Sequence, residues 1–458
     1  MNRPHRDAGP ARRVPVDRRL GVTAAAGFGA AGVACGLKAA ARPDLALVVG
    51  DPGTVAAGVF TTNLVVAAPV VWSRARLAAS ADARVVVLNA GNANACTGPA
   101  GDAAVLATAQ RAAAELGCRP EQVLVCSTGV IGVPMDVAKV AEGVAKAAVS
   151  LDRSGGQAAA EAILTTDTVA KQAGVRVPGG ATVAGMAKGA AMLAPALAPP
   201  TPAGDPADRG TPLGFPGPLR ADRGTPSGFP GPLRPHATML AVLTTDAVAE
   251  PAALRAALAA ASAATFNRIT VDGAQSTNDT VLLLASGASG VRPHDDDLAG
   301  AVEAVCGDLA GQMLADAEGG SKVVDVQVGG AGGVAEAVAV ARRVADSPLV
   351  KAAVYGGDPN WGRVLQAAGT AGVDFDPAAV RLEVAGGPGA AGVEEPAGPL
   401  ERITLVRLGV PTGADARGAM ACREIELRLH LGGRGPWAGV RTSDLTPEYV
   451  RLNSEYTT

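Results

Sequence analysis

A continuous apolar run near the middle of the chain limits the fold more than any other segment. It follows a proline- and glycine-rich stretch, and it extends from Thr238 through Met239 and Leu240 to Asp246. A short apolar run bounded by turn-forming residues is typical of a strand that is buried on both faces. We therefore expect Thr238 to be the first residue of a buried strand around which other elements pack.

Thr238 is also a candidate nucleophile. A threonine hydroxyl needs a base to become reactive. If the bond between Ala237 and Thr238 were cleaved, the new α-amine would lie beside Oγ1, and its ordinary pKa of roughly 7.7–8.0 would let it accept the hydroxyl proton. Most threonines in such runs are ordinary strand residues, so the nucleophile hypothesis depends on the remaining motifs.

Strand and helix patterns alternate along the chain. Strands are predicted at 45–49, 56–60, 83–88 and 122–126, and helices at 102–117, 136–151, 251–264, 298–316 and 334–344. The strand segments are rich in β-branched residues, whereas apolar residues in the helical segments recur at a period near 3.6. The strand at 83–88 is expected to end in a polar loop at 89–95. This alternation indicates an α/β or α+β fold.

Composition excludes several classes of function. The chain has 458 residues, which is enough for two or three domains or subdomains. A net charge of −3 and 3% aromatic residues argue against a nucleic-acid partner. The six cysteines have no CxxC spacing, so we expect reduced thiols and no metal site. No segment reads as a signal peptide or a bilayer span, so we expect a cytoplasmic protein without a membrane partner.

The sequence divides into five parts. They are a flexible, arginine-rich arm at 1–20, a first α/β domain at 21–198, an inserted loop at 199–236, a nucleophile-bearing part of the core at 237–330 and a smaller C-terminal subdomain at 331–458. Within the loop, residues 207–220 recur as 221–234 with Ser227 in place of Leu213. Its proline and glycine content disfavours helix and paired strand, so we interpret it as a surface insertion that arose by duplication.

The segment Ser127-Thr128-Gly129 follows a predicted strand. Backbone N–H groups at such a turn can point into a cavity and stabilise an oxyanion. An ordinary strand-to-helix turn is the commoner use of this sequence, so the residues alone leave both interpretations open.

Taken together, the motifs resemble the glutamate N-acetyltransferase family, also called the ornithine acetyltransferase family. The matching segments are 89–98, 127–132, 165–168, 187–189, 237–240, 244–246, 272–273, 276–280, 318–319, 358–363 and 453–458. Agreement at so many places in one order is highly specific, although each segment alone is a weak signal. We interpret 358–363 as structural, a turn with a packed Trp361.

The resemblance implies a fold and an activity. The fold is an α/β layered sandwich of two face-to-face sheets flanked by helices, with a smaller C-terminal α/β subdomain. The chain would cleave itself between Ala237 and Thr238, and chains 1–237 and 238–458 would assemble as a heterotetramer of two of each. The enzyme would then transfer the acetyl group of N2-acetyl-L-ornithine to L-glutamate in arginine biosynthesis. Acetyl-CoA is a further possible donor, and no cofactor is implied.

The resemblance also assigns roles to residues. Thr238 would be the nucleophile, and backbone N–H groups around Thr128 and Gly129 would form the oxyanion hole. Contacts to substrate are implied for Thr165, Lys188, Thr238, Glu318, Asn453 and Thr458. The residue types suit such substrates, since a lysine can bind the α-carboxylate and a glutamate the side-chain ammonium of ornithine.

The chain departs from the family pattern, and two alternatives stay open. Family members have no insertion between the lysine and the nucleophile, whereas here the loop at 199–236 adjoins the bond that would be cleaved. One alternative is an aminopeptidase or amidase of the same N-terminal-nucleophile type, in which water replaces glutamate. The other is an uncleaved, non-catalytic paralogue.

Overall fold

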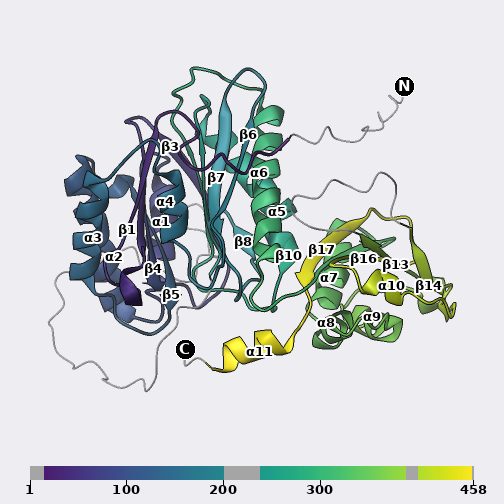
Figure 1. Cartoon of the computed structure of the whole chain (residues 1–458). Helices are drawn as coiled ribbons and strands as arrows, with labels where there is room; N and C mark the ends of the chain where they lie inside the picture. The colour runs from purple at the N-terminus through teal and green to yellow at the C-terminus, as the bar shows by residue number, and fades with distance from the viewer. Residues whose placement is uncertain (1–14, 201–237, 388–400, 456–458) are drawn as a thin grey trace, which may run out of the picture.

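The computed structural model describes residues 15–200, 238–387 and 401–455. Two sheets pack face to face, and the C-terminal part of the chain forms a third sheet beside them (Figure 1). Most of the predicted arm, nearly all of the inserted loop, Ala237 and Thr458 lie outside the described residues.

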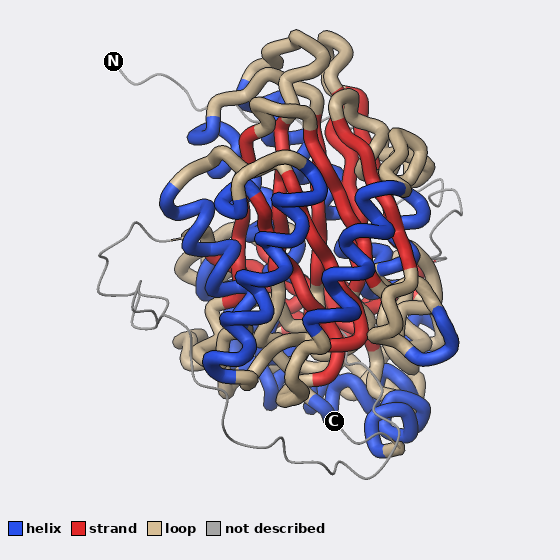
Figure 2. The backbone as a smooth tube through the Cα atoms, turned by 90° about the vertical axis from the view of Figure 1, so that its left-hand side faces the viewer, coloured by secondary structure: helices blue, strands red, loops and turns tan. Residues whose placement is uncertain are grey.

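The first sheet is four-stranded, in the order β1-β2-β4-β5. Its strands are β1 (Phe28–Val33), β2 (Leu45–Gly50), β4 (Val85–Asn92) and β5 (Val123–Val130). Its helices are α1 (Ala68–Ala79), α2 (Gly98–Leu116), α3 (Val137–Val149) and α4 (Gly156–Ala162), with the 3-10 turns η1 (Ala39–Ala41) and η2 (Pro120–Gln122). Figure 2, which is viewed from this side, shows helices covering the face of the strands.

The second sheet is six-stranded, in the order β6-β7-β9-β11-β3-β8. Its strands are β6 (Lys171–Arg176), β7 (Thr182–Lys188), β9 (Leu240–Thr245), β11 (Thr280–Ala285), β3 (Val55–Thr61) and β8 (Leu197–Ala198). Its outer face is covered by α5 (Pro251–Ala264) and α6 (Asp295–Ala315). The 3-10 turn η3 (Phe266–Arg268) comes just after α5. The predicted layered α/β sandwich is confirmed.

Strand periodicity explains how the layers hold together. In β2, Ala46 and Val48 belong to the core between the two sheets, whereas Leu45 and Leu47 pack toward α2 and α3. Successive strand side chains point to opposite faces, so a strand covered on both sides reads as an uninterrupted apolar run. β9 is such a strand, because each of its residues is buried.

Thr238 lies outside β9, so its prediction as the first strand residue is wrong by two positions. The ladder starts at Leu240, which pairs with Lys188 on one side and Thr280 on the other. The backbone N–H of Met239 donates to the side chain of Asp279 (3.0 Å) instead of a neighbouring strand. Thr238 is nevertheless buried, with 3% of its surface exposed.

The predicted strands at 45–49 and 56–60 are confirmed as β2 and β3, and the helix at 251–264 as α5. Two strands run further than predicted. β4 continues to Asn92 and β5 to Val130, so part of the expected loop at 89–95 and the expected turn at 127–129 are strand. The two strands go on pairing there because Gly91 and Gly129, at φ of 120° and 136°, allow a close approach without side chains.

The third sheet is seven-stranded, in the order β10-β17-β12-β16-β13-β14-β15. Its strands are β10 (Ile269–Thr270), β12 (Val323–Gly329), β13 (Arg381–Gly387), β14 (Ile403–Arg407), β15 (Val410–Pro411), β16 (Glu424–His430) and β17 (Ala438–Ser443). The helices of this part are α7 (Val334–Ala345), α8 (Pro348–Tyr355), α9 (Trp361–Ala368), α10 (Arg417–Met420) and α11 (Pro447–Ser454), with η4 (Pro377–Ala379). The predicted boundary at 331 falls too late, because β12 already pairs with β16 and β17.

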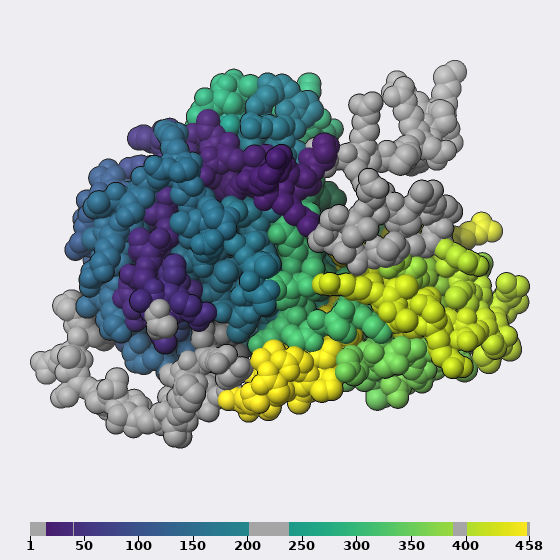
Figure 3. Space-filling view, viewed as in Figure 1, coloured from purple at the N-terminus to yellow at the C-terminus, as the bar shows by residue number. Residues whose placement is uncertain are grey.

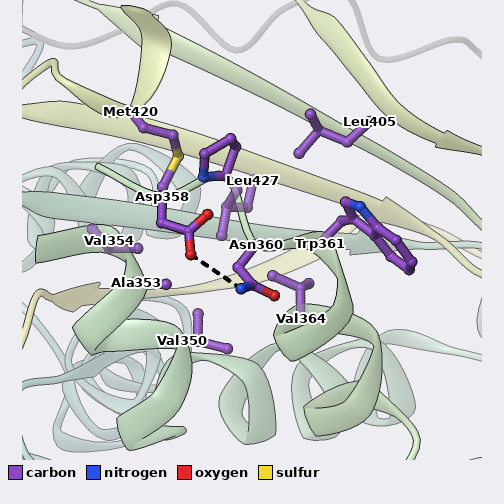
Figure 4. A pocket seen from close by; sticks show the side chains of 11 residues that line it. Val350, Ala353, Val354, Asp358, Asn360, Trp361, Val364, Leu405, Met420 and Leu427 are labelled. Carbon is purple, nitrogen blue, oxygen red and sulfur yellow. Dashed lines mark hydrogen bonds between the residues drawn. The ribbon is translucent and has the colours of Figure 1, made fainter. Parts of the chain in front are cut away.

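The segment 358–363 caps a helix, as Figure 4 shows from close by. Asn360 Oδ1 accepts from the backbone N–H of Arg363 (3.2 Å) at the start of α9, and Asn360 Nδ2 donates to Asp358 Oδ2 (3.1 Å). A structural role fits these contacts. The expectation of a packed Trp361 is only partly right, because 38% of its surface is exposed.

The part of the chain that forms the third sheet and its helices, which we call the C-terminal unit, packs against the rest of the molecule, as Figure 3 shows. Between them, Thr446 Oγ1 donates to the Gly319 carbonyl (2.6 Å) and the Tyr449 hydroxyl donates to Asp272 (3.3 Å). Within the described ranges, none of the helices combines the length and apolar character that a bilayer span requires.

Because β9 lies in the centre of its sheet, we expect truncation of a side chain in β9 to destabilise the protein. Leu243 is fully buried in that strand, so Leu243→Ala should lower the free energy of unfolding by about 2–5 kcal/mol. Leu408→Ala is the control, because 69% of Leu408 is exposed. Urea-induced unfolding of both variants measures the difference. Equal stability of the two variants would contradict the core position of β9.

Candidate active site

Lys188 connects the predicted site residues. It ends β7, none of its surface is exposed, and its Nζ donates three hydrogen bonds. The acceptors are Thr165 Oγ1 (2.7 Å), the Thr238 carbonyl (2.8 Å) and Thr128 Oγ1 (3.3 Å). The structure thus brings together one residue from each of four separate segments that the sequence analysis singled out.

These three contacts restrict what else Lys188 can bind. A lysine ammonium has three N–H donors, and here each one has an acceptor within the protein. A substrate carboxylate could bind Lys188 only by displacing one of them. The geometry therefore favours a lysine that positions the backbone of Thr238 over a free charge that waits for a ligand.

A buried ionic network surrounds Lys188. Lys171 Nζ lies 2.7 Å from Asp167 Oδ1 and 2.6 Å from Asp316 Oδ2, and Asp167 Oδ2 lies 3.7 Å from Lys188 Nζ. Burial lowers the pKa of Lys188 to about 8, although Asp167 opposes the shift. Burial acts to raise the pKa of Asp167, but the charges of Lys188 and Lys171 hold it below its ordinary value.

The hydroxyl of Thr238 has a partner that the sequence analysis did not identify. Thr238 Oγ1 lies 3.1 Å from Ser276 Oγ, and both side chains are buried. Ser276 Oγ also accepts from the backbone N–H of Asn278 (3.1 Å). Ser276 belongs to the matched segment 276–280, and that segment precedes β11, the parallel neighbour of β9. Only the adjacency of β11 and β9 brings Ser276 to Thr238, and the order of strands in a sheet cannot be read from the sequence.

Thr128 and Gly129 lie at the irregular end of the β4–β5 pair. The pairing shifts register at Asn92, opposite Thr128. A Cβ on Gly129 would lie 2.2 Å from the carbonyl carbon of Gly91, so only glycine fits. Bulges of this kind redirect backbone groups near functional sites. The side chain of Asn278, in the segment that leads into β11, holds this end of the pair, since Nδ2 donates to the carbonyls of Ala93 (2.7 Å) and Ser127 (2.8 Å).

A cavity of about 1080 Å³ adjoins the network. Its lining includes acidic, hydroxyl and basic side chains: Asp136, Asp167, Asp316, Glu318, Thr165, Thr168, Lys38, Arg42 and Lys139. Thr165 connects the cavity to Lys188, whereas Lys188 and Thr238 themselves do not line it. Thr238 therefore lies behind the cavity wall in this state of the chain.

Glu318 lines the same cavity, whereas Asn453 does not, and the side-chain amide of Asn453 donates to the carbonyl of Tyr449 (2.9 Å). Burial raises the pKa of Glu318, although the nearby side chain of Asn453 opposes the shift. The backbone N–H of Glu318 donates to the carbonyl of Ala190 (2.8 Å), just after Lys188. Across the residues that the structure covers, no three His, Cys, Asp or Glu side chains are grouped so as to hold a metal ion.

Comparison with known proteins agrees with these motifs. The model of the ArgJ family matches residues 29–201 and 227–458 and leaves out part of the predicted insertion. A protein of Mycolicibacterium paratuberculosis named arginine biosynthesis bifunctional protein ArgJ is 44% identical, over 96% of this chain and 97% of that protein. A protein of Streptomyces coelicolor with the same name is also 44% identical, over 95% of this chain and 100% of that protein.

A solved structure of ornithine acetyltransferase from Mycobacterium tuberculosis in complex with ornithine is 49% identical. The match covers 40% of the present chain and 100% of the chain in that structure, with a TM-score of 0.40. The extent of the family match and the identity to full-length relatives settle the assignment. The chain belongs to the ArgJ family, whose members are acyltransferases of arginine biosynthesis.

Proposed function

We propose that the chain cleaves itself between Ala237 and Thr238 and then transfers the acetyl group of N2-acetyl-L-ornithine to L-glutamate through an acetyl ester on Thr238. The observation that carries this proposal is the setting of Thr238. Its hydroxyl lies beside Ser276 and its carbonyl is held by Lys188, in a site from which water is largely excluded. Such a hydroxyl is oriented and desolvated before any reaction begins.

Cleavage would proceed through an ester. Thr238 Oγ1 attacks the carbonyl carbon of Ala237, and its proton passes by way of Ser276 to the departing nitrogen of Thr238. Water then hydrolyses the ester and leaves a carboxylate on Ala237 and a free α-amine on Thr238. Ser276 suits the relay because its Oγ is 3.1 Å from Thr238 Oγ1 and can both accept and donate.

Acetyl transfer would follow in two half-reactions. The α-amine of Thr238 takes the Oγ1 proton while Oγ1 attacks the acetyl carbonyl, and the oxyanion is stabilised at the Thr128–Gly129 backbone. The proton then passes to the departing amine of ornithine. In the second half, the amine of glutamate attacks the ester and Thr238 regains its proton. Glu318, on the cavity wall, provides a negative charge for the side-chain ammonium of ornithine.

The two products of cleavage would remain together because their strands interleave. In the six-stranded sheet, β9 and β11 come from the second product, whereas β6 and β7 on one side and β3 and β8 on the other come from the first. Separating the products would break the hydrogen bonds of β9 with β7 and of β11 with β3. We propose an assembly with two copies of each product, which native mass spectrometry can measure.

Acetyl-CoA is a second candidate donor. The cavity of about 1080 Å³ is slightly larger than the roughly 300–1,000 Å³ that small-molecule sites occupy, and it is larger than an acetylated amino acid needs. Lys38, Arg42 and Lys139 in its wall suit phosphate groups. Assays with glutamate and either acetylornithine or acetyl-CoA distinguish one donor from two.

The cleavage proposal predicts a mass pattern. Purified wild type should give two fragments that meet between Ala237 and Thr238, whereas Thr238→Ala should stay full-length. Thr244→Ala is a matched control, because Thr244 is a buried threonine at the far end of β9, and it should be cleaved. A wild type that remains full-length after long incubation at neutral pH would refute maturation and remove the base of the proposed nucleophile.

The covalent intermediate predicts parallel lines in double-reciprocal plots of rate against acetylornithine at several glutamate concentrations. Acetylornithine alone should leave an acetyl group on the peptide that begins at Thr238. Intersecting lines together with an unmodified peptide would rule out the ester. Release of acetate without glutamate, at a rate matching transfer, would instead identify the amidase alternative.

Lys188 predicts an alkaline limit to activity. Its ammonium uses three donors, and it loses one as the pH rises through its pKa of about 8, so kcat/KM should fall above that pH. Lys188→Arg should abolish this limb, because guanidinium stays protonated. Lys351→Arg is the control, since the pKa of buried Lys351 is also lowered to about 8 but it lies in the C-terminal unit. Loss of the limb in Lys351→Arg alone would contradict the assignment.

A further inference from the structure

Asp279 is a buried carboxylate with an unused oxygen beside the nucleophile. It directly precedes β11, and none of its surface is exposed. Its Oδ1 accepts from the backbone N–H of Met239 (3.0 Å), whereas its Oδ2 has no hydrogen-bond partner among the described residues. Buried polar atoms without partners are rare and costly in folded proteins. The free oxygen therefore calls for a partner that the described residues do not supply.

The nitrogen of Thr238 is a candidate for that partner, because Thr238 directly precedes Met239 in the chain. Covalent geometry keeps the nitrogens of consecutive residues within roughly 3.7 Å of each other, and Met239 already binds Oδ1. The two oxygens of a carboxylate can bind neighbouring N–H groups in this way. Before cleavage, the nitrogen of Thr238 is a neutral amide with one proton. After cleavage it is an amine that can carry three protons and a positive charge.

The surroundings of Thr238 would otherwise weaken that amine as a base. Thr238 is only 3% exposed, and the ammonium of Lys188 lies 2.8 Å from its carbonyl oxygen. Burial and a nearby positive charge both lower the pKa of an amine. A negative charge at Asp279 opposes both effects, so it would keep the amine able to take the Oγ1 proton near neutral pH.

The charged groups that face Asp279 are Lys188, on β7, and Asp272, in the loop after β10. Burial raises the pKa of Asp279 to about 7, Asp272 adds to this shift, and Lys188 and the N–H groups of Met239 and Ser276 oppose it. An uncleaved chain can thus carry Asp279 without charge, and the appearance of an ammonium beside it would favour the carboxylate.

We propose that Asp279 is a positioning residue, whose free Oδ2 receives the α-ammonium of Thr238 and keeps the catalytic amine basic. This inference rests on the proposed cleavage before Thr238. In the first half-reaction the amine takes the proton of Oγ1, becomes an ammonium paired with Asp279, and passes the proton to the departing amine of ornithine. In the second half-reaction it takes a proton from the attacking amine of glutamate, pairs with Asp279 again, and returns the proton to the departing Oγ1. Asp279 touches neither substrate nor the attacked carbonyl.

The experiment is the pH profile of kcat/KM for acetylornithine in Asp279→Asn. The amide retains the acceptor for Met239 but loses the charge. Because activity requires a neutral α-amine, and Asp279 raises the pKa of that amine, the acidic limb of the variant should move to lower pH by about one unit or more. The plateau should also fall, since a weaker base remains. An acidic limb at the wild-type position would overturn the inference.

Asp246→Asn is the matched control. Asp246 is a buried carboxylate just beyond the other end of β9, and both of its oxygens accept backbone N–H groups, from Thr182 (2.7 Å) and Ala26 (2.9 Å). Its variant should lose stability but keep the acidic limb. The same displacement in both variants would overturn the inference, because it would reflect a general loss of structure.

A second measurement holds even if Asp279→Asn is not cleaved. In cleaved wild type with ¹⁵N-labelled threonine, the α-amine should titrate close to the free-peptide value of roughly 7.7–8.0, despite its burial. Titration more than about one unit below that value would overturn the role of Asp279. A wild type that is not cleaved defeats the proposed function as well, whereas a cleaved, active wild type with a depressed amine defeats only this inference.

Discussion

The site depends on a buried ammonium that must be fully satisfied. Removing a lysine from water is costly unless its charge and each of its donors are compensated. Lys188 meets this condition with three hydrogen bonds and with the charge of Asp167 at 3.7 Å. Its acceptors come from β5, from the loop before β6 and from the segment just before β9. Because a buried N–H donor of Lys188 without an acceptor would be costly, these three segments are held in fixed positions relative to one another.

The sheet order explains why a chain break before Thr238 is compatible with the fold. β9 lies between β7 and β11, buried on both faces, and its ladder begins only at Leu240. The two residues before the ladder are held mainly by side chains, Met239 by Asp279 and Thr238 by Ser276 and Lys188. Their backbone contact to β11 runs from the N–H of Thr280 to the carbonyl of Met239 (3.2 Å), on the far side of the proposed break. A break at this point costs no ladder hydrogen bond, because the strand has not yet started.

Local pattern predicted the elements better than their ends and their neighbours. The apolar run after Thr238 was enough to predict a buried strand, and the helical period was enough for α5. The extension of β5 through Thr128 and Gly129 was missed because two glycines on adjacent strands permit it together. Ser276 and Asp279 were also missed as partners of the nucleophile segment, because their contacts depend on β11 lying beside β9, and the sequence does not show which strands are neighbours. The sequence analysis assigned Lys188 to the substrate carboxylate, whereas its three acceptors within the protein could be seen only in the structure.

The charges around Thr238 are balanced in a way that depends on the state of the chain. Lys188 and Lys171 are countered by Asp167 and Asp316, so this network is neutral without Asp279. In the uncleaved chain a charged Asp279 would add an excess negative charge, and burial accordingly raises its pKa to about 7. Cleavage would add a titratable amine at the one place where the charge of Asp279 is useful. A carboxyl group that is costly before maturation would thus become half of an ion pair after it, so the site would be complete only in the cleaved protein.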